Sequence, residues 1–232
     1  MTTGPAPAAP DYGAAFAAWR AGAASWGGFV GHDFVAGLSD GTLPRAAFLH
    51  YLRQDYVFLV HFSRAWALGV VKAETLDEMK TCAATVDGLV NHEMRLHVRT
   101  CAEAGIEEAA LFVEEEASEN LAYTRYVLEA GYSGDFLDLM AALAPCVFGY
   151  GEIGARLAAD KTSDAYGDWI ATYAGEEYQA LCGEVGAMID AALTRRLGPD
   201  FAASPRMASL ARRFDTATRL EVGFWGMGFA AR

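Results

Sequence analysis

Three segments of the sequence each place one reactive side chain within an apolar stripe that repeats every three or four residues. The reactive residues are Asp55, Cys146 and Glu221. Their stripes consist of Phe48, Leu52, Asp55, Leu59 and Phe62; of Leu139, Leu143, Cys146, Tyr150, Ile153 and Leu157; and of Leu210, Phe214, Ala217, Glu221 and Trp225. This spacing is that of one face of an α-helix, so all three side chains should point into a helical core.

These three residue types are suited to covalent and proton-transfer chemistry. A cysteine thiol can act as a nucleophile, and a buried carboxyl group can bind N–H groups or transfer a proton. Each residue alone has a structural explanation, because most buried cysteines pack as small apolar groups and most lone buried acids belong to ion pairs. Cys146 is the only cysteine that we place on such a stripe, and Pro145 beside it removes a helical hydrogen bond.

Aromatic residues accompany each reactive group. Phe58, Tyr150 and Phe224 lie three or four residues from Asp55, Cys146 and Glu221, and Tyr123 and Tyr173 lie on two further helical segments. Aromatic walls with a few convergent polar groups are typical of a pocket for a flat heteroaromatic ligand. Convergence of three such stripes favours this interpretation over an ordinary aromatic core.

The segments that must position these groups are all predicted to be helical. Pro44 suits the first turn of a helix, and Gly105 and Gly131 suit the left-handed position after one. Short connections make neighbouring helices antiparallel, which predicts an all-α, single-domain bundle of about seven helices over residues 11–232. We expect residues 1–10 to form a disordered leader. The expected helices cover residues 11–26, 44 onward, 76–104, 107–130, 134–159, 163–197 and 205–230.

The charge balance and the apolar runs exclude two classes of partner. The sequence has 30 acidic and 18 basic residues, a net charge of −12. A nucleic-acid surface needs clustered lysine and arginine, whereas the basic pairs here are only Arg195-Arg196 and Arg212-Arg213. No uninterrupted apolar run reaches the roughly 18 residues of a membrane span. We therefore expect neither nucleic-acid nor membrane partners.

The cysteines are spaced too widely for a thiolate metal site. Cys82, Cys101, Cys146 and Cys182 form no C-x-x-C pair. Residues 1–10 lack the charged start and apolar stretch of an export signal. Free thiols and a cytoplasmic location are the expectation.

A series of short motifs follows in order between residues 29 and 230. They are His32-x-Phe34-Val35, Asp40-Gly41-Thr42-Leu43-Pro44, Gln54-Asp55-Tyr56, His61-Phe62, Glu93-Met94-x-Leu96-His97, Leu143-Ala144-Pro145-Cys146, Trp169-Ile170-Ala171-Thr172-Tyr173 and Glu221-Val222-Gly223-Phe224-Trp225-Gly226-Met227. In these motifs the sequence resembles the TenA/THI-4 family. The resemblance implies a haem oxygenase-like helical bundle, assembly as a homotetramer and no cofactor.

The resemblance also implies a role for each inward side chain. Asp55 corresponds to the acid that binds the ring nitrogen and exocyclic amine of an aminopyrimidine, and Cys146 corresponds to the nucleophile. Glu221 corresponds to the glutamate near the leaving group, a general acid and base. Phe58 stands where many members carry tyrosine, which removes a hydroxyl. The aromatic residues that the resemblance places around the substrate are Phe58, Tyr123, Tyr150 and Tyr173.

The implied activity is hydrolysis in thiamin salvage, as a thiaminase II or aminopyrimidine aminohydrolase. Such an enzyme converts 4-amino-5-aminomethyl-2-methylpyrimidine and water to 4-amino-5-hydroxymethyl-2-methylpyrimidine and ammonia, and some members cleave thiamin itself to the pyrimidine alcohol and the thiazole. Addition of a thiolate to an unsaturated ring carbon supplies the electrons that break the C–N bond. The sequence leaves open the preferred substrate, the ring carbon attacked, and whether Glu221 or a tyrosine activates Cys146.

Three other functions are alternatives on the same bundle. Glu93 and His97 have i, i+4 spacing, with His92 adjacent, and could belong to a metal-dependent oxidase or oxygenase. A dinuclear site needs more inward carboxylates and histidines, so we interpret Glu93 and His97 as a pair that links helices and expect no metal. A non-catalytic regulatory binding protein is the second alternative. A PQQ-synthesis-type oxidase would need a basic pocket, which the acidic stripes argue against.

Overall fold

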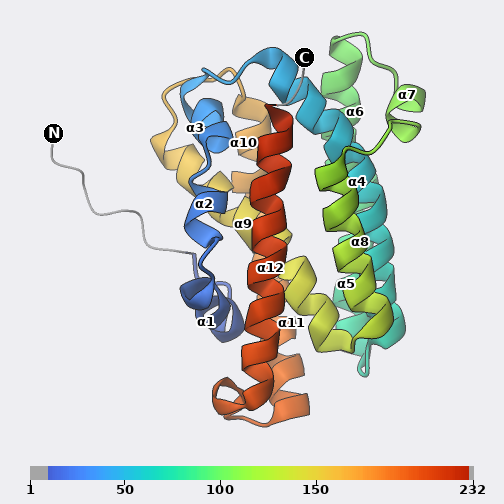
Figure 1. The fold of residues 1–232 in the computed structure, drawn as a ribbon, viewed down its shortest axis with the longest axis vertical. Coiled ribbons are helices and arrows are strands. Elements are labelled where there is room, and N and C mark those ends of the chain that lie inside the picture. The colour runs from blue at the N-terminus through green and yellow to red at the C-terminus, as the bar shows by residue number, and fades with distance from the viewer. Residues whose placement is uncertain (1–9, 230–232) are drawn as a thin grey trace, which may run out of the picture.

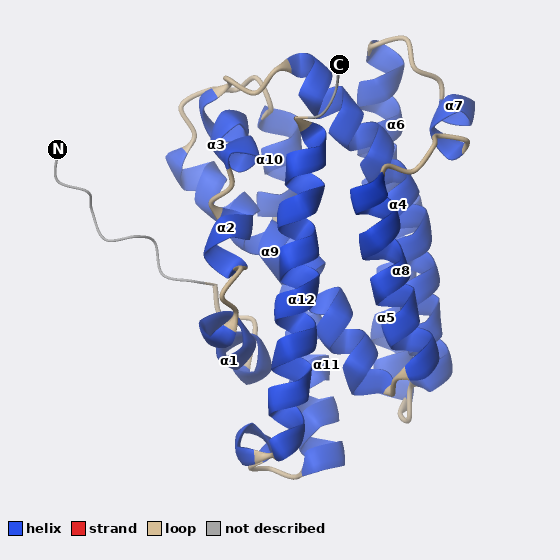
Figure 2. Ribbon diagram, in the orientation of Figure 1, coloured by secondary structure: helices blue, strands red, loops and turns tan. Residues whose placement is uncertain are grey.

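The structure is a computed structural model that describes residues 10–229, and within that range the chain forms helices and no strand (Figure 1). Figure 2 shows helices joined by short loops throughout the described range. The expected all-α bundle is therefore confirmed, whereas the expected leader lies outside the described residues apart from Pro10. The elements are α1 (Ala14–Gly22), α2 (Trp26–Val30), α3 (Asp33–Asp40), α4 (Arg45–Lys72), α5 (Leu76–Gly88), a π-helical turn η1 (Leu89–Glu93), α6 (Met94–Glu103), α7 (Glu108–Phe112), α8 (Ser118–Ser133), α9 (Phe136–Asp160), α10 (Gly167–Ala174), α11 (Glu176–Leu197), a 3₁₀ turn η2 (Phe201–Ala203) and α12 (Pro205–Gly228).

The described range holds more helices than the seven expected, because several expected segments are divided. Residues 11–26 form α1 and the start of α2, and residues 113–117 separate α7 from α8. Gly175 takes an extended conformation (φ −63°, ψ 151°) and separates α10 from α11, where one helix over 163–197 was expected. A π turn interrupts 76–104, and α3 was not expected as a separate helix.

The two glycines predicted to end helices behave differently. Gly105 has a φ of +80°, the left-handed conformation expected after a helix. Gly131 does not end its helix, because α8 continues to Ser133. A Cβ at Gly131 would lie 2.9 Å from Leu68 Cδ1, so this glycine allows α8 to pack closely against α4. Gly131 therefore permits close helix packing and does not terminate a helix.

Helix α9 is the central element of the core and carries Cys146. Its start is fixed by a capping box in which the side chains of Asp135 and Asp138 each accept a backbone N–H. The helix runs unbroken through Pro145. It is long and apolar enough to cross a membrane, but its most apolar window is 94% buried within the bundle. Those features identify it as the core helix of a bundle.

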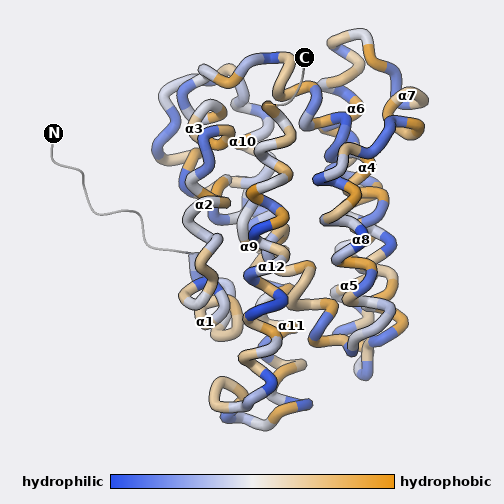
Figure 3. The backbone as a smooth tube through the Cα atoms, in the orientation of Figure 1, coloured by the Kyte–Doolittle hydropathy of each residue, from blue (hydrophilic) through white to orange (hydrophobic). Residues whose placement is uncertain are grey.

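The three helices that carry the reactive residues contact one another. Helix α12 packs against α9, α8 and α4, and α4 also packs against α9 (Figure 1). Orange and blue residues alternate along α12 in Figure 3, as expected of a helix with one buried face. Asp55, Cys146 and Glu221 are all buried. The periodicity of the sequence thus predicted correctly that all three point inward.

A pair of glycines on α11 tests how closely the chain before α1 packs on this bundle. Gly186 lies against the backbone carbonyl of Tyr12, which a Cβ would overlap, whereas a Cβ at Gly183 would meet nothing within 4 Å. Gly186→Ala should lower the free energy of unfolding by about 2 kcal/mol or more. Gly183→Ala, on the same helix, should raise it by roughly 0.5–1 kcal/mol. Urea denaturation measures both, and similar values for the two variants would contradict the packing described.

Candidate active site

Asp55 on α4 is a buried carboxylate with two donors on one oxygen. The Tyr51 hydroxyl, one turn earlier on α4, donates to Asp55 Oδ2 at 2.9 Å. His97 Nε2 on α6 lies 2.6 Å from the same oxygen. No described residue donates to Oδ1. The protein therefore engages one oxygen of this carboxylate and leaves the other without a hydrogen-bond donor among the described residues, although only 3% of the residue is exposed.

Glu221 on α12 is paired with Tyr123 on α8. The Tyr123 hydroxyl donates to Glu221 Oε1 at 2.8 Å. Burial and the negative charge of Asp55 raise the pKa of Glu221 to about 8, although the hydrogen bond from Tyr123 and the nearby Cys146 thiol oppose the rise. A carboxyl group with this pKa can give or take a proton near neutral pH, as a general acid or base must.

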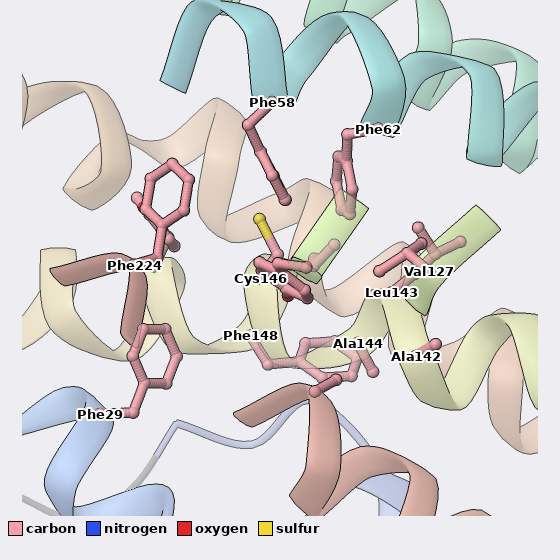
Figure 4. Close-up of a cluster of buried hydrophobic side chains, with 14 of the residues drawn as sticks. Phe29, Phe58, Phe62, Val127, Ala142, Leu143, Ala144, Cys146, Phe148 and Phe224 are labelled. Atoms are coloured by element: carbon pink, nitrogen blue, oxygen red, sulfur yellow. The ribbon is translucent and has the colours of Figure 1, made fainter. Parts of the chain in front are cut away.

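Cys146 lies on α9 beside Glu221. Its sulfur points toward Phe58 of α4 (Figure 4), and 8% of the residue is exposed. Burial raises the pKa of the Cys146 thiol well above its ordinary value, and Glu221, Glu93 and Asp55 add to the rise. The resting thiol is therefore neutral, and it needs a proton acceptor before it can act as a nucleophile. Glu221 is the adjacent group that can serve.

Burial alone does not distinguish Cys146 from the other cysteines. All four are buried and free, so the expectation that only Cys146 faces inward is wrong. Cys182 on α11, for example, is fully buried with its sulfur 3.4 Å from the carbonyl oxygen of Val147. The feature that singles out Cys146 is its position beside a carboxyl group that titrates near neutrality.

The aromatic residues expected at the site form two groups around the reactive side chains. In the first, the Phe58 ring lies 4.9 Å from Tyr123 and 5.4 Å from Phe224, centroid to centroid. In the second, the ring centroids of Tyr150 and Tyr173 are 4.9 Å apart. All five rings are buried. The structure thus brings together every aromatic residue that the sequence nominated.

Tyr51, which the sequence reasoning missed, links these two groups. Its hydroxyl oxygen lies 3.4 Å from that of Tyr150 and accepts a hydrogen bond from Trp169 Nε1 at 3.3 Å. Its ring meets Phe224 edge-on at 6.1 Å. The signal that could have identified it is its position one turn before Asp55, where an i, i+4 partner faces the same side.

Glu93 and His97 each link helices, as the sequence suggested, but they do so through different partners. The two meet only through the backbone, where His97 Nδ1 lies 3.1 Å from the Glu93 carbonyl oxygen. The Glu93 side chain instead accepts a hydrogen bond from the Tyr173 hydroxyl at 2.7 Å, and His97 pairs with Asp55. Within residues 10–229 no group of three or more histidine, cysteine or acidic side chains is placed to hold a metal ion.

Glu93 lies between the buried groups and the surface. It ends the π-helical turn η1, a rare element that is frequent at functional sites. Burial and the charge of Asp55 raise the pKa of Glu93 to about 7. The residue also lines a surface hollow of about 380 Å³ together with His92 and Tyr178. Asp55, Cys146 and Glu221 do not line this hollow and lie deeper in the bundle.

Comparison with known proteins gives a consistent result. The model of the TENA/THI-4/PQQC family matches residues 19–231. The chain is 35% identical over 210 residues to an aminopyrimidine aminohydrolase of Halalkalibacterium halodurans, covering 89% of this chain and 91% of that protein.

Two solved structures have the same fold. A protein described as a TenA family transcription regulator from Silicibacter sp. superposes with a TM-score of 0.92 at 62% identity, covering 94% of this chain and 97% of that one. A TenA homologue from P. horikoshii superposes with a TM-score of 0.81 at 27% identity, covering 94% and 99% of the two chains.

The raised pKa of Glu221 predicts how stability depends on pH. Its folded-state pKa of about 8 exceeds the unfolded value, so its contribution is full below the unfolded pKa and is lost as pH rises through about 8. Between about pH 5 and 8, the unfolding free energy of the wild type should fall relative to that of Glu221→Gln, by up to about 1.4 kcal/mol per pH unit. Urea denaturation across this range measures the difference.

Glu78→Gln is the matched control for this prediction. Burial opposes ionisation of Glu78, but hydrogen bonds from Arg196 and other partners lower its pKa to about 2. Its stabilising contribution is present above the unfolded pKa and is lost only as pH falls through about 2. The difference between wild type and Glu78→Gln should therefore stay constant between about pH 5 and 8. A constant difference for Glu221→Gln as well would contradict the raised pKa.

Proposed function

The chain belongs to the TENA/THI-4/PQQC family, and we propose that it is an aminopyrimidine hydrolase of thiamin salvage. The proposed reaction converts 4-amino-5-aminomethyl-2-methylpyrimidine and water to 4-amino-5-hydroxymethyl-2-methylpyrimidine and ammonia. One observation carries this proposal. Asp55, Cys146 and Glu221, from three different helices, converge in a buried site walled by aromatic rings. The name of the relative from Halalkalibacterium halodurans supports the same reaction.

Asp55 and the aromatic rings are proposed to bind the substrate. The free Oδ1 of Asp55 accepts an N–H from the ring's amino group, which is an interaction that a buried carboxylate strengthens. Phe58, Tyr150 and Tyr173 surround the flat ring and exclude water from it. Loss of the tyrosine hydroxyl at position 58 leaves the face above Cys146 apolar (Figure 4).

Cys146 and Glu221 are proposed to carry the chemistry. The Glu221 carboxylate takes the thiol proton, and the sulfur bonds to an unsaturated carbon of the ring. The ring electrons then expel the amine from the exocyclic methylene, and Glu221 returns the proton so that ammonia leaves. Water adds to the methylene and gives its proton to Glu221. The S–C bond then breaks, the ring regains its aromaticity, and the thiolate recovers a proton from Glu221.

The depth of the site favours a small leaving group. Asp55, Cys146 and Glu221 are at most 8% exposed, so departing ammonia needs less displacement of side chains than a thiazole does. We therefore propose the aminomethylpyrimidine rather than thiamin as the main substrate.

We also propose that the chain assembles as a homotetramer, as the TenA/THI-4 family does. Exposed apolar side chains such as Phe112, at the end of α7, and Val113, just after it, are suited to subunit contact.

A direct role as a DNA-binding regulator fits the chain less well. The relative from Silicibacter sp. is described as a transcription regulator. With a net charge of −12, however, this chain would repel a polyanion. A metal-dependent oxidase is also less well supported, because both nitrogens of His97 face protein acceptors and Glu93 is bonded to Tyr173.

Replacement of the thiol tests the proposed mechanism. Cys146→Ser should lower kcat by on the order of 10³-fold or more, because a hydroxyl of nearly the same size is a far weaker nucleophile at neutral pH. Release of ammonia and of the hydroxymethylpyrimidine is the readout, and calorimetry should show that binding of the product persists. Cys182→Ser, a change of the same chemistry at another buried cysteine, should leave kcat nearly unchanged. Wild-type turnover by Cys146→Ser would contradict the mechanism.

A further inference from the structure

His97 is a fully buried histidine with an acceptor opposite each ring nitrogen. Nδ1 lies 3.1 Å from the carbonyl oxygen of Glu93, and Nε2 lies 2.6 Å from Asp55 Oδ2. A backbone carbonyl can only accept, so Nδ1 carries a hydrogen. The Asp55 oxygen opposite Nε2 also accepts from the Tyr51 hydroxyl, and an ionised carboxylate is acceptor-only. With Asp55 ionised, this geometry requires a doubly protonated imidazolium.

The neighbouring acidic groups favour such a cation. Two other carboxyl groups, those of Glu93 and Glu221, lie close enough to Asp55 that its charge raises their pKa values. An ionised carboxylate buried without a counter-charge is costly. Tyr51 supplies Asp55 with a hydrogen bond but no charge. His97 is the basic side chain that contacts the carboxylate.

The titratable groups that face His97 come from two elements. Asp55 approaches from α4, and Glu93 from the π turn η1. Although burial opposes it, the contact with Asp55 raises the pKa of His97 above its ordinary value, and Glu93 adds to the rise. These contributions agree with the charge state that the geometry indicates.

We propose that His97 is a positioning residue that keeps Asp55 ionised and holds its Oδ2, so that Oδ1 is presented to the N–H groups of an aminopyrimidine. This inference rests on the proposed function, in which Asp55 binds the substrate ring. His97 itself touches neither the substrate nor the thiol. Its effect on catalysis is exerted through the charge and orientation of Asp55, because an anionic acceptor binds an N–H group more strongly than a neutral carboxyl group does.

A double-mutant cycle separates this role from a merely structural one. His97→Gln should raise the Kd for the hydroxymethylpyrimidine and lower kcat/KM, each by on the order of 10- to 100-fold, because the acceptor is neutralised or displaced. In an Asp55→Asn background the same change should have less than about a threefold effect, because the group through which His97 acts is gone. Equal effects in the two backgrounds would overturn the proposal.

His61→Gln is the matched control, because His61 is a half-buried histidine that contacts Glu116, Arg64 and Arg125 rather than the site. It should leave Kd and kcat/KM unchanged. Comparable losses in His61→Gln and His97→Gln would show that any histidine replacement disturbs the fold, and the specific role of His97 would then be wrong. Thermal denaturation of each variant checks that the protein compared is folded.

The charge of His97 can be measured on the wild-type protein even where a variant fails to fold. Imidazole ¹⁵N shifts of the ligand-free protein at neutral pH should show one buried histidine protonated on both nitrogens, and Asp55→Asn should return that ring to a single proton. A neutral His97 in an active enzyme would overturn this inference alone. An imidazolium in a protein that neither binds nor hydrolyses the aminopyrimidine would instead overturn the proposed function.

Discussion

The contact between Asp55 and His97 joins α4 to α6 through the interior, with 2.6 Å between the carboxylate oxygen and the imidazole nitrogen. Much of the site depends on it. Tyr51 donates a hydrogen bond to the same oxygen and accepts one from Trp169. The Asp55 carboxylate is thereby connected to the aromatic residues of α10. Removal of one partner from a buried ion pair leaves an uncompensated charge in a medium that cannot solvate it.

This charge also explains the acid–base behaviour of the remaining site. Burial alone would raise the pKa values of Glu93 and Glu221, and the nearby carboxylate raises both further, to about 7 and about 8. The bundle therefore holds two carboxyl groups that exchange protons near neutrality around a thiol that does not ionise by itself. A nucleophile activated only when a neighbouring base takes its proton suits hydrolysis in a site closed to bulk water.

Helical periodicity was sufficient to predict the inward direction of Asp55, Cys146 and Glu221, because a 3.6-residue repeat fixes which side of a helix is buried. It could not predict that Asp55 meets His97, since the two are 42 residues apart and their contact depends on how α4 packs on α6. The break at Gly175 was missed because glutamates follow it and favour helix. The chemical roles came from family resemblance, and the structure adds the hydrogen-bond partners that such resemblance left unspecified.

A crystal structure of the Cys146→Ser variant with the aminomethylpyrimidine bound would show whether Asp55, Cys146 and Glu221 form the substrate site. We expect the ring to lie among Phe58, Tyr150 and Tyr173, with its amino group on Asp55 Oδ1 and its aminomethyl nitrogen toward Glu221. His97 should retain its contact with Asp55 Oδ2 in that complex. A ring bound in the surface hollow beside Glu93 and Tyr178, with the Asp55–Glu221 interior unoccupied, would show that the substrate site lies elsewhere.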